Sequence, residues 1–315
     1  MRRNHSVFAI VMLITALAFT FGCQEEEVNE FELLAEAGDA YFSTYSGVNI
    51  NIDDLVLAIT GGEDLYLIDW RSAEDYADAH IAGAVNMALT DLDDELAMLP
   101  ADRKIINICY TGQTASFATA AMNLAGLDAQ NLKFGMCSIT NDTSIVRKTD
   151  KWAAQIAEDE GFPLETTANE LETTYEFPTL DTGEDTVAGI IAARLDEAAA
   201  GWSIAAADVF TGDFFVVNYW PEDQYLDPGH IPGAYQFTPK EDLASDAKLA
   251  YLPTDETIVV YCYSGQTSAQ VSAYLRLLGY DAKSLLFGMN GFDYASIPAS
   301  KYTAPQNDYT GILGD

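Results

Sequence analysis

The sequence has few cysteines, few histidines and few basic residues, and each shortage excludes a class of protein. Four cysteines in 315 residues exclude a small fold built from disulfides. The three histidines, His5, His80 and His230, lie far apart in the sequence, so no metal site is expected. Only 15 Lys and Arg accompany 49 Asp and Glu, for a net charge of −34. Without a basic patch, this charge excludes nucleic acid as a partner.

The remaining composition is that of a folded, two-domain chain. Hydrophobic residues make up 49% of the sequence and the mean hydropathy is +0.01, which excludes a disordered chain. At about 150 residues per domain, the length predicts two domains, each able to bury a core without disulfides.

The first residues have the pattern of an export signal. Arg2 and Arg3 precede an apolar run of 16 residues, 7–22, which is short for a membrane span but typical of a signal peptide. Cys23 follows Gly22 directly, and this junction resembles the signal of bacterial lipoproteins. The resemblance implies a signal peptide over 1–22, a lipid on Cys23, and export to the cell envelope. An ordinary cleaved signal and an uncleaved anchor are the alternatives. We predict an acidic tether over 23–40.

The rest of the chain contains one long internal repeat. The segment that begins at Cys109 recurs 153 residues later at Cys262, and 14 of the 28 positions up to Met136 and Met289 are identical. Upstream, the motif at His80 recurs at His230. Copies this long predict two homologous domains rather than a solenoid. We place the domains at 41–160 and 185–305, the linker at 161–184, and a tail at 306–315.

Each copy alternates predicted strands with predicted helices. Apolar runs at 65–69, 104–109, 214–218 and 257–262 predict buried strands, and shorter strands are expected at 131–134 and 284–287. A helical spacing of apolar residues follows each cysteine and ends at Gly126 or Gly279. Strands that alternate with helices predict an α/β fold with a parallel sheet covered on both faces.

The cysteines stand where a buried strand passes through a short loop into a helix. There, loop N–H groups and the helix dipole converge on the strand end, which stabilises an anion and lowers the pKa of a thiol. Gly112 and Gly265 allow each loop to curl so that its amides face inward. We therefore predict nucleophilic thiolates at Cys109 and Cys262. The alternative is a pair of small buried core cysteines.

At this point the chain resembles the rhodaneses, sulfurtransferases with a cysteine active-site loop. The resemblance rests on the cysteine loops, on the entry motifs around 67–84 and 225–234, and on the turns at 134–136 and 287–289. It implies two rhodanese-like domains, each a parallel five-stranded sheet flanked by helices, with the loop at the sheet's carboxyl edge. No cofactor is implied.

The family's mechanism implies that Cys109 and Cys262 carry sulfur as persulfides between a small donor and a thiol or other nucleophile. Gln113 and Gln266 are expected at the mouth of the loops, and the loop hydroxyls either donate to the persulfide or form local turn bonds. The predicted loop residues are Tyr110, Thr111, Gly112, Gln113, Thr114, Tyr263, Ser264, Gly265, Gln266 and Thr267.

Neither loop contains the Arg or Lys that many active rhodaneses carry. An acidic protein with neutral loops favours a persulfide or polysulfide donor over dianionic thiosulfate. Copy two also has Asn218 and Trp220 where copy one has Asp69 and Arg71, a pair that supports the site in the family.

The competing interpretation of the whole chain is a non-catalytic tandem module that carries sulfur or binds a protein. A cysteine-loop phosphatase is disfavoured because the loops lack the arginine that clamps phosphate.

Three other residues carry secondary hypotheses. His80 and His230 are expected to support the turn before a strand through backbone hydrogen bonds rather than to act as general bases. Cys137, which follows the first glycine–methionine turn, either resolves a persulfide or pairs with Cys109, or it is a chance cysteine at a helix start.

Overall fold

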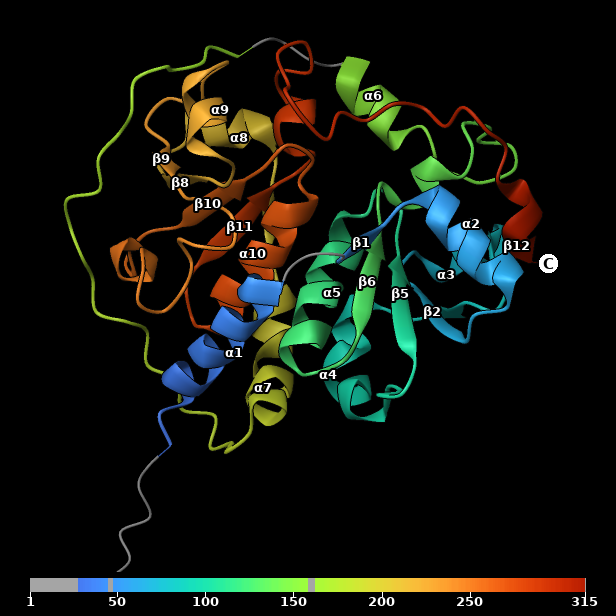
Figure 1. The fold of residues 1–315 in the computed structure, drawn as a ribbon, viewed down its shortest axis with the longest axis horizontal. Helices are drawn as coiled ribbons and strands as arrows, with labels where there is room; N and C mark the ends of the chain where they lie inside the picture. Colours follow the sequence, from blue (N-terminus) through green and yellow to red (C-terminus); the bar gives the residue numbers. More distant parts are fainter. Residues whose placement is uncertain (1–27, 45–47, 158–161, 315) are drawn as a thin grey trace, which may run out of the picture.

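The computed structural model describes residues 28–44, 48–157 and 162–314. Figure 1 shows two α/β units side by side, the first in blue to green and the second in yellow to red. Each unit contains one parallel five-stranded sheet flanked by helices, so the predicted fold class is confirmed.

The sheet of domain 1 has the strand order β1-β6-β5-β2-β4. Its strands are β1 (Asn49–Ile50), β2 (Leu65–Asp69), β4 (Val85–Asn86), β5 (Lys104–Ile108) and β6 (Ala129–Leu132). The helices are α1 (Glu30–Thr44), α2 (Ile52–Gly61), α3 (Ala73–Asp78), α4 (Leu92–Glu95), α5 (Gln113–Leu124) and α6 (Lys151–Ala157). The 3₁₀ turns are η1 (Leu89–Asp91), η2 (Leu96–Met98) and η3 (Gly135–Ser138).

Domain 2 repeats this topology in the order β7-β11-β10-β8-β9. Its strands are β7 (Ser203–Ile204), β8 (Phe215–Asn218), β9 (Tyr235–Gln236), β10 (Ile258–Tyr261) and β11 (Ala282–Leu285). The helices are α7 (Val187–Ala199), α8 (Ala206–Thr211), α9 (Glu222–Leu226) and α10 (Gln266–Leu277), and the 3₁₀ turns are η4 (Leu249–Tyr251) and η5 (Gly288–Gly291). Every residue of β8 and β10 is buried, as expected for strands covered by helices on both faces.

One hydrophobic cluster, the shared core, extends across both domains, and each domain also has a separate cluster of its own. Helices α5 and α10 pack against each other between the two sheets (Figure 1). Phe117 of α5 and Tyr274 of α10 are fully buried in the same apolar cluster. Because each cysteine loop leads directly into one of these helices, the helix pair brings the two loops to the domain interface.

Residues 30–40, predicted to be part of an acidic tether, form most of helix α1 instead. Phe31, Leu34 and Phe42 of this helix are buried in the shared core, and Glu30 accepts backbone hydrogen bonds from Thr182 and Gly183. The acidic residues of α1 had suggested a solvated segment, but its apolar residues recur at helical spacing and cover the domain interface.

The predicted tail beyond residue 305 also belongs to the fold. After the 3₁₀ turn η6 (Thr310–Ile312), strand β12 (Leu313–Gly314) pairs antiparallel with β3 (His80–Ile81) of domain 1. The chain therefore returns from domain 2 to domain 1. A two-residue strand has no sequence signature of its own, which is why the pairing was not predicted.

The predicted linker follows the outer side of domain 2, where Figure 1 shows it in yellow-green. Glu165 and His230 exchange two backbone hydrogen bonds of 2.8 Å, so the segment is attached to that domain. None of the helices in the described ranges has the length and apolar character that crossing a bilayer requires. The predicted signal peptide and Cys23 lie outside the described residues.

Candidate functional site

Cys109 lies at the carboxyl end of β5, the middle strand of its sheet. Its Sγ accepts hydrogen bonds from the backbone N–H groups of Gly112, at 3.1 Å, and Ala115, at 3.4 Å. Gly112 has a φ of 83°, a conformation that favours glycine and turns the loop back over the sulfur. Backbone N–H groups of the loop and of the helix start therefore point at the Cys109 sulfur, as the sequence predicted.

Cys262 has the same position after β10 in domain 2. The N–H of Ser268 donates to its Sγ at 3.3 Å, and the thiol lies 3.5 Å from the Ser268 hydroxyl, to which it donates. Gly265, with a φ of 73°, is the counterpart of Gly112. The repeat therefore produces a similar loop twice, at the start of α5 and of α10, although one backbone N–H donates to the Cys262 sulfur where two donate to the Cys109 sulfur.

Both cysteines are almost closed off from solvent. Cys109 is 2% exposed and Cys262 is 3% exposed. Burial raises the pKa of the Cys109 thiol above its usual value, and the N–H groups of Ala115, Thr111 and Gly112 offset this only in part. The predicted lowering of the pKa is therefore wrong for Cys109, because desolvation outweighs the amides.

The repeated phenylalanine–glycine–methionine turns support the loops from behind. The N–H of Met136 donates to the carbonyl of Cys109 at 2.9 Å, and that of Met289 donates to the carbonyl of Cys262 at 3.0 Å. A Cβ on Gly135 would lie 2.3 Å from the Cys109 carbonyl oxygen, so no larger residue fits there. The close approach explains why glycine recurs at this position in both copies.

Gln113 and Gln266 do not line the mouth of the loops as predicted. Both are 2% exposed and cross the domain interface. The Oε1 atom of Gln113 accepts from the N–H of Phe287, and that of Gln266 accepts from the N–H of Phe134. The sequence could not show this, because the partner of each glutamine lies in the other domain.

The loop hydroxyls have two kinds of position. Thr111 Oγ1 accepts from Gln113 Nε2 at 3.0 Å, and Ser264 Oγ accepts from Gln266 Nε2 at 3.1 Å. These two hydroxyls brace their own loops. Thr114 and Thr267 are half-buried in the first turns of α5 and α10.

Asp69 and Arg71 form a fully buried ion pair beside the first loop. The shortest distance, from Arg71 Nη2 to Asp69 Oδ2, is 2.7 Å, and both side chains have no exposed area. Arg71 Nη2 also donates to the carbonyl of Ala79 at 2.6 Å. Arg71 is thus held as a structural cation. In domain 2 the neutral Asn218 and Trp220 occupy these positions and are fully buried.

The environment of Tyr110 differs from that of its counterpart Tyr263. The Nζ atoms of Lys148 and Lys151 lie 5.0 and 4.5 Å from the centre of the Tyr110 ring. Tyr263 instead stacks on Trp220, with ring centres 4.8 Å apart. The cations that the loop sequence lacks therefore reach loop 1 from residues 147–151. Three basic residues within five positions, 147–151, in so acidic a chain were the signal for them.

One carboxylate holds this basic cluster in place. Lys148 and Arg147 both form ion pairs with Asp75, whose side chain is 2% exposed. Burial disfavours ionisation of Asp75, but hydrogen bonds from Lys148, Tyr110 and Ser72 hold the pKa of the carboxyl well below its usual range. Asp75 therefore stays charged and fixes Lys148 beside Tyr110.

The two histidines have structural surroundings. His80 Nδ1 lies 2.9 Å from the carbonyl of Tyr76, and His230 Nδ1 lies 2.8 Å from that of Tyr225. The His80 ring also stacks on the ring of Tyr76, and the His230 ring stacks on that of Tyr225. These contacts agree with the expected supporting role at the turn before a strand.

Cys137 is a free thiol, as are Cys109 and Cys262. It is fully buried beside Trp152 and Tyr302. Burial raises its pKa to about 12, which leaves almost no thiolate at neutral pH. This environment disfavours a resolving role for Cys137.

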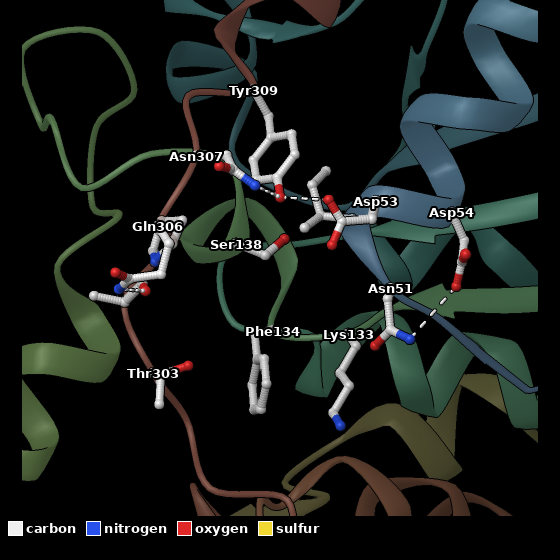
Figure 2. A pocket seen from close by; sticks show the side chains of 13 residues that line it. Asn51, Asp53, Asp54, Lys133, Phe134, Ser138, Thr303, Gln306, Asn307 and Tyr309 are labelled. Carbon is white, nitrogen blue, oxygen red and sulfur yellow. Dashed lines mark hydrogen bonds between the residues drawn. The ribbon is translucent and has the colours of Figure 1, made fainter.

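A cavity of about 440 Å³ is lined in part by Phe134 and Ser138, as Figure 2 shows. Asn51, Asp53 and Lys133 line it together with residues 303–307 and Tyr309. Neither loop cysteine is among the residues that line this cavity, so it does not provide the approach to sulfur. In the described part of the chain, no three His, Cys, Asp or Glu side chains are arranged to hold a metal ion.

Comparison with known proteins identifies the repeated unit. The model of the rhodanese-like domain matches residues 52–142 and 208–295. "Putative sulfurtransferase YtwF" of Bacillus subtilis is 28% identical over 85 residues, which cover 27% of this chain and 82% of that protein. "Putative thiosulfate sulfurtransferase 2" of Mycobacterium bovis is 29% identical over 113 residues, which cover 32% of this chain and 34% of that protein.

Among solved structures, a thiosulfate sulfurtransferase from Pseudomonas aeruginosa is similar over 87% of this chain and 49% of its own, with 14% identity and a TM-score of 0.31. A rhodanese-like domain protein from Staphylococcus aureus matches 28% of this chain and 86% of its own, with 22% identity and a TM-score of 0.27. The two matched segments span more than half of the sequence and contain both cysteine loops. The chain therefore belongs to the rhodanese-like domain family and carries that domain twice.

Proposed function

We propose that this protein is a sulfurtransferase that moves sulfane sulfur through persulfides on Cys109 and Cys262. The observation that supports it most strongly is the pair of backbone N–H groups aimed at the Cys109 sulfur, at 3.1 and 3.4 Å. Amides fixed in this way stabilise a sulfur anion without reorganising during the reaction. Membership of the family and similarity to proteins named as sulfurtransferases support the same reaction class.

The reaction needs no oxidant and no cofactor. The cysteine thiolate attacks the terminal sulfur of a donor persulfide, R–S–SH. A new Sγ–S bond forms while the S–S bond of the donor breaks, and the donor leaves as R–S⁻. An acceptor thiolate then attacks the outer sulfur of Cys–S–SH. The electron pair of the broken bond returns to Sγ, which regenerates the cysteine thiolate.

The two domains are proposed to differ in their preferred donor. Lys148 is already paired with Asp75, but Lys151, whose Nζ lies 4.5 Å from the centre of the Tyr110 ring, places positive charge next to loop 1. This charge suits an anionic donor such as a polysulfide or thiosulfate. The neutral stack of Tyr263 on Trp220 gives domain 2 no such attraction. The argument against thiosulfate, drawn from cation-free loops, is therefore weaker for domain 1 than for domain 2.

The function is tested by sulfur transfer to a thiol acceptor from polysulfide and from thiosulfate. Cys109→Ser and Cys262→Ser are each expected to lose the turnover of their own domain, because serine cannot form the persulfide. The double variant should fall to the uncatalysed rate. Transfer that survives in the double variant would refute the proposal.

A non-catalytic module that binds a partner is the second candidate. The near-complete burial of both cysteines favours it, since a sulfur carrier has to meet its donor. Wild-type protein that transfers no sulfur from either donor, yet folds normally, would support this candidate.

We also propose that the protein is exported and lipid-anchored at Cys23, on the pattern of residues 1–23 alone. The mature protein is then expected in the membrane fraction, with a lipid mass on an N-terminal Cys23. Cys23→Ser is expected to abolish the lipid. A mature protein without it, or one that retains residues 1–22, would contradict this proposal.

A further inference from the structure

The two cysteine loops exchange glutamine side chains across the domain interface. Gln113, the first residue of α5, reaches the N–H of Phe287 in domain 2 with its Oε1 atom, at 2.6 Å. Gln266, the first residue of α10, reaches the N–H of Phe134 in domain 1 at 3.0 Å. Both glutamines are buried and the two N–H donors are partly buried, so a donor left without its partner is unfavourable.

Each glutamine holds the turn that supports the other cysteine. The turn at Phe287 leads to Met289, whose N–H donates to the Cys262 carbonyl. Phe287 and Phe134 both have a φ of 64°, a region that bulky residues rarely occupy. The N–H that the glutamine fixes thus belongs to a strained residue.

The rest of each glutamine is bonded within its own loop. Gln113 Nε2 donates to Thr111, and Gln266 Nε2 donates to Ser264. A Cβ on Gly265 would lie 2.4 Å from Gln113 Oε1, and a Cβ on Gly112 would lie 2.5 Å from Gln266 Oε1. Each loop therefore leaves room for the glutamine of the other domain, and each glutamine contacts both loops.

We propose that Gln113 and Gln266 are positioning residues that act across the domain interface. Gln113 holds the Cys262 loop in place, and Gln266 holds the Cys109 loop. The reactivity of each thiol then depends on a side chain from the other domain. This inference rests on the proposed function only in taking the two thiols as the reacting groups.

The test measures alkylation of each cysteine in the full chain, with no sulfur donor present. Iodoacetamide labelling is followed with time by mass spectrometry of the cysteine peptides. In Gln113→Met, the loss of a buried hydrogen bond is expected to loosen the Cys262 loop and to speed Cys262 labelling by about five- to tenfold. Gln266→Met should have the same effect on Cys109. Hydrogen exchange at the Phe287 amide should rise in Gln113→Met, while that at Phe134 should not.

Ser245→Ala is the matched control. Ser245 of domain 2 also forms a hydrogen bond to a residue of helix α1, from its Oγ to Asp39 Oδ2 at 2.6 Å, and it contacts neither cysteine loop nor the turns behind them. Its loss is expected to leave Cys262 labelling within about twofold of wild type. Equal acceleration by Ser245→Ala would mean general loosening of the interface and would overturn the proposal.

A change confined to Cys109 in Gln113→Met, or no change at either cysteine, would also overturn it. If Gln113→Met does not fold, Gln113→Asn removes the same bond with a shorter polar side chain, and the same Cys262 acceleration is expected. Labelling that responds across the interface in a protein without sulfur transfer would refute the proposed function and leave the positioning role intact.

Discussion

Cys109 is expected to react with iodoacetamide about 100-fold faster at pH 9 than at pH 7, because the thiolate fraction rises about tenfold per pH unit below the pKa. Burial raises the pKa of this thiol above its usual value, so the increase should continue through the whole interval. The measurement uses Cys262→Ser protein and quantifies the Cys109 peptide alone.

A small free thiol, labelled in the same buffers, is the control for this pH profile. Its rate should level off earlier than that of Cys109, since nothing raises its pKa. A Cys109 rate that reaches a plateau below pH 8 would show that the loop amides outweigh burial and that the thiolate is already formed. That result would contradict the claim that burial raises the pKa of Cys109, and it would leave the proposed sulfur transfer standing.

Asp69→Ala is expected to lower the free energy of unfolding by about 3–5 kcal/mol, because it leaves a buried arginine without its counter-charge. Asp69 accepts hydrogen bonds from both the backbone N–H and the guanidinium of Arg71, in a site without solvent contact. Urea unfolding followed by circular dichroism measures the change. The slope of the unfolding free energy against urea concentration should be the same in the variant and the wild type.

Asp64→Ala provides the same substitution in an exposed ion pair. Asp64 lies 2.8 Å from Arg103 but its side chain is 81% exposed, so its loss should change stability by less than about 1 kcal/mol. The double variant Asp69→Asn with Arg71→Trp copies the neutral pair of domain 2 and should recover part of the stability. An Asp69→Ala effect as small as that of Asp64→Ala would contradict the buried-pair account.

The parts of the fold that local pattern determines could be predicted from the sequence. The run at 65–69 became β2 with the same bounds, and the strands before Cys109 and Cys262 ended one residue earlier than predicted. A continuous β-branched run bounded by turn residues specifies a buried strand without help from the rest of the chain. The glycine in each loop likewise predicted the curl that aims amides at sulfur.

The features that could not be predicted from the sequence depend on contacts between segments that lie far apart in the chain. Helix α1 was assigned to a tether because its acidic residues are visible in the sequence, whereas the interface that buries its other face is not. The glutamines were placed at the loop mouth, although the recurrence of the same residue at 113 and 266 indicated a shared role. Lys148 reaches loop 1 from almost 40 residues away, so the loop sequence alone looked free of cations.

The comparison of the two loops suggests how one fold supports two distinct sites. The backbone conformation is similar in both loops, since each has a glycine in the left-handed region followed by a helix that begins at glutamine. The side chains around it differ, since loop 1 has a buried ion pair and two lysines while loop 2 has tryptophan and asparagine. We therefore expect the domains to share a mechanism and to differ in the donor each prefers.

The most direct measurement is the intact and peptide mass of the protein after exposure to polysulfide, without reducing agent. The account predicts a gain of one sulfur atom on the peptide of Cys109 and on that of Cys262, and release of both by an added thiol acceptor. Each gain should vanish in the serine variant of its own cysteine. A protein that gains sulfur on neither cysteine, with either polysulfide or thiosulfate, would contradict the central claim.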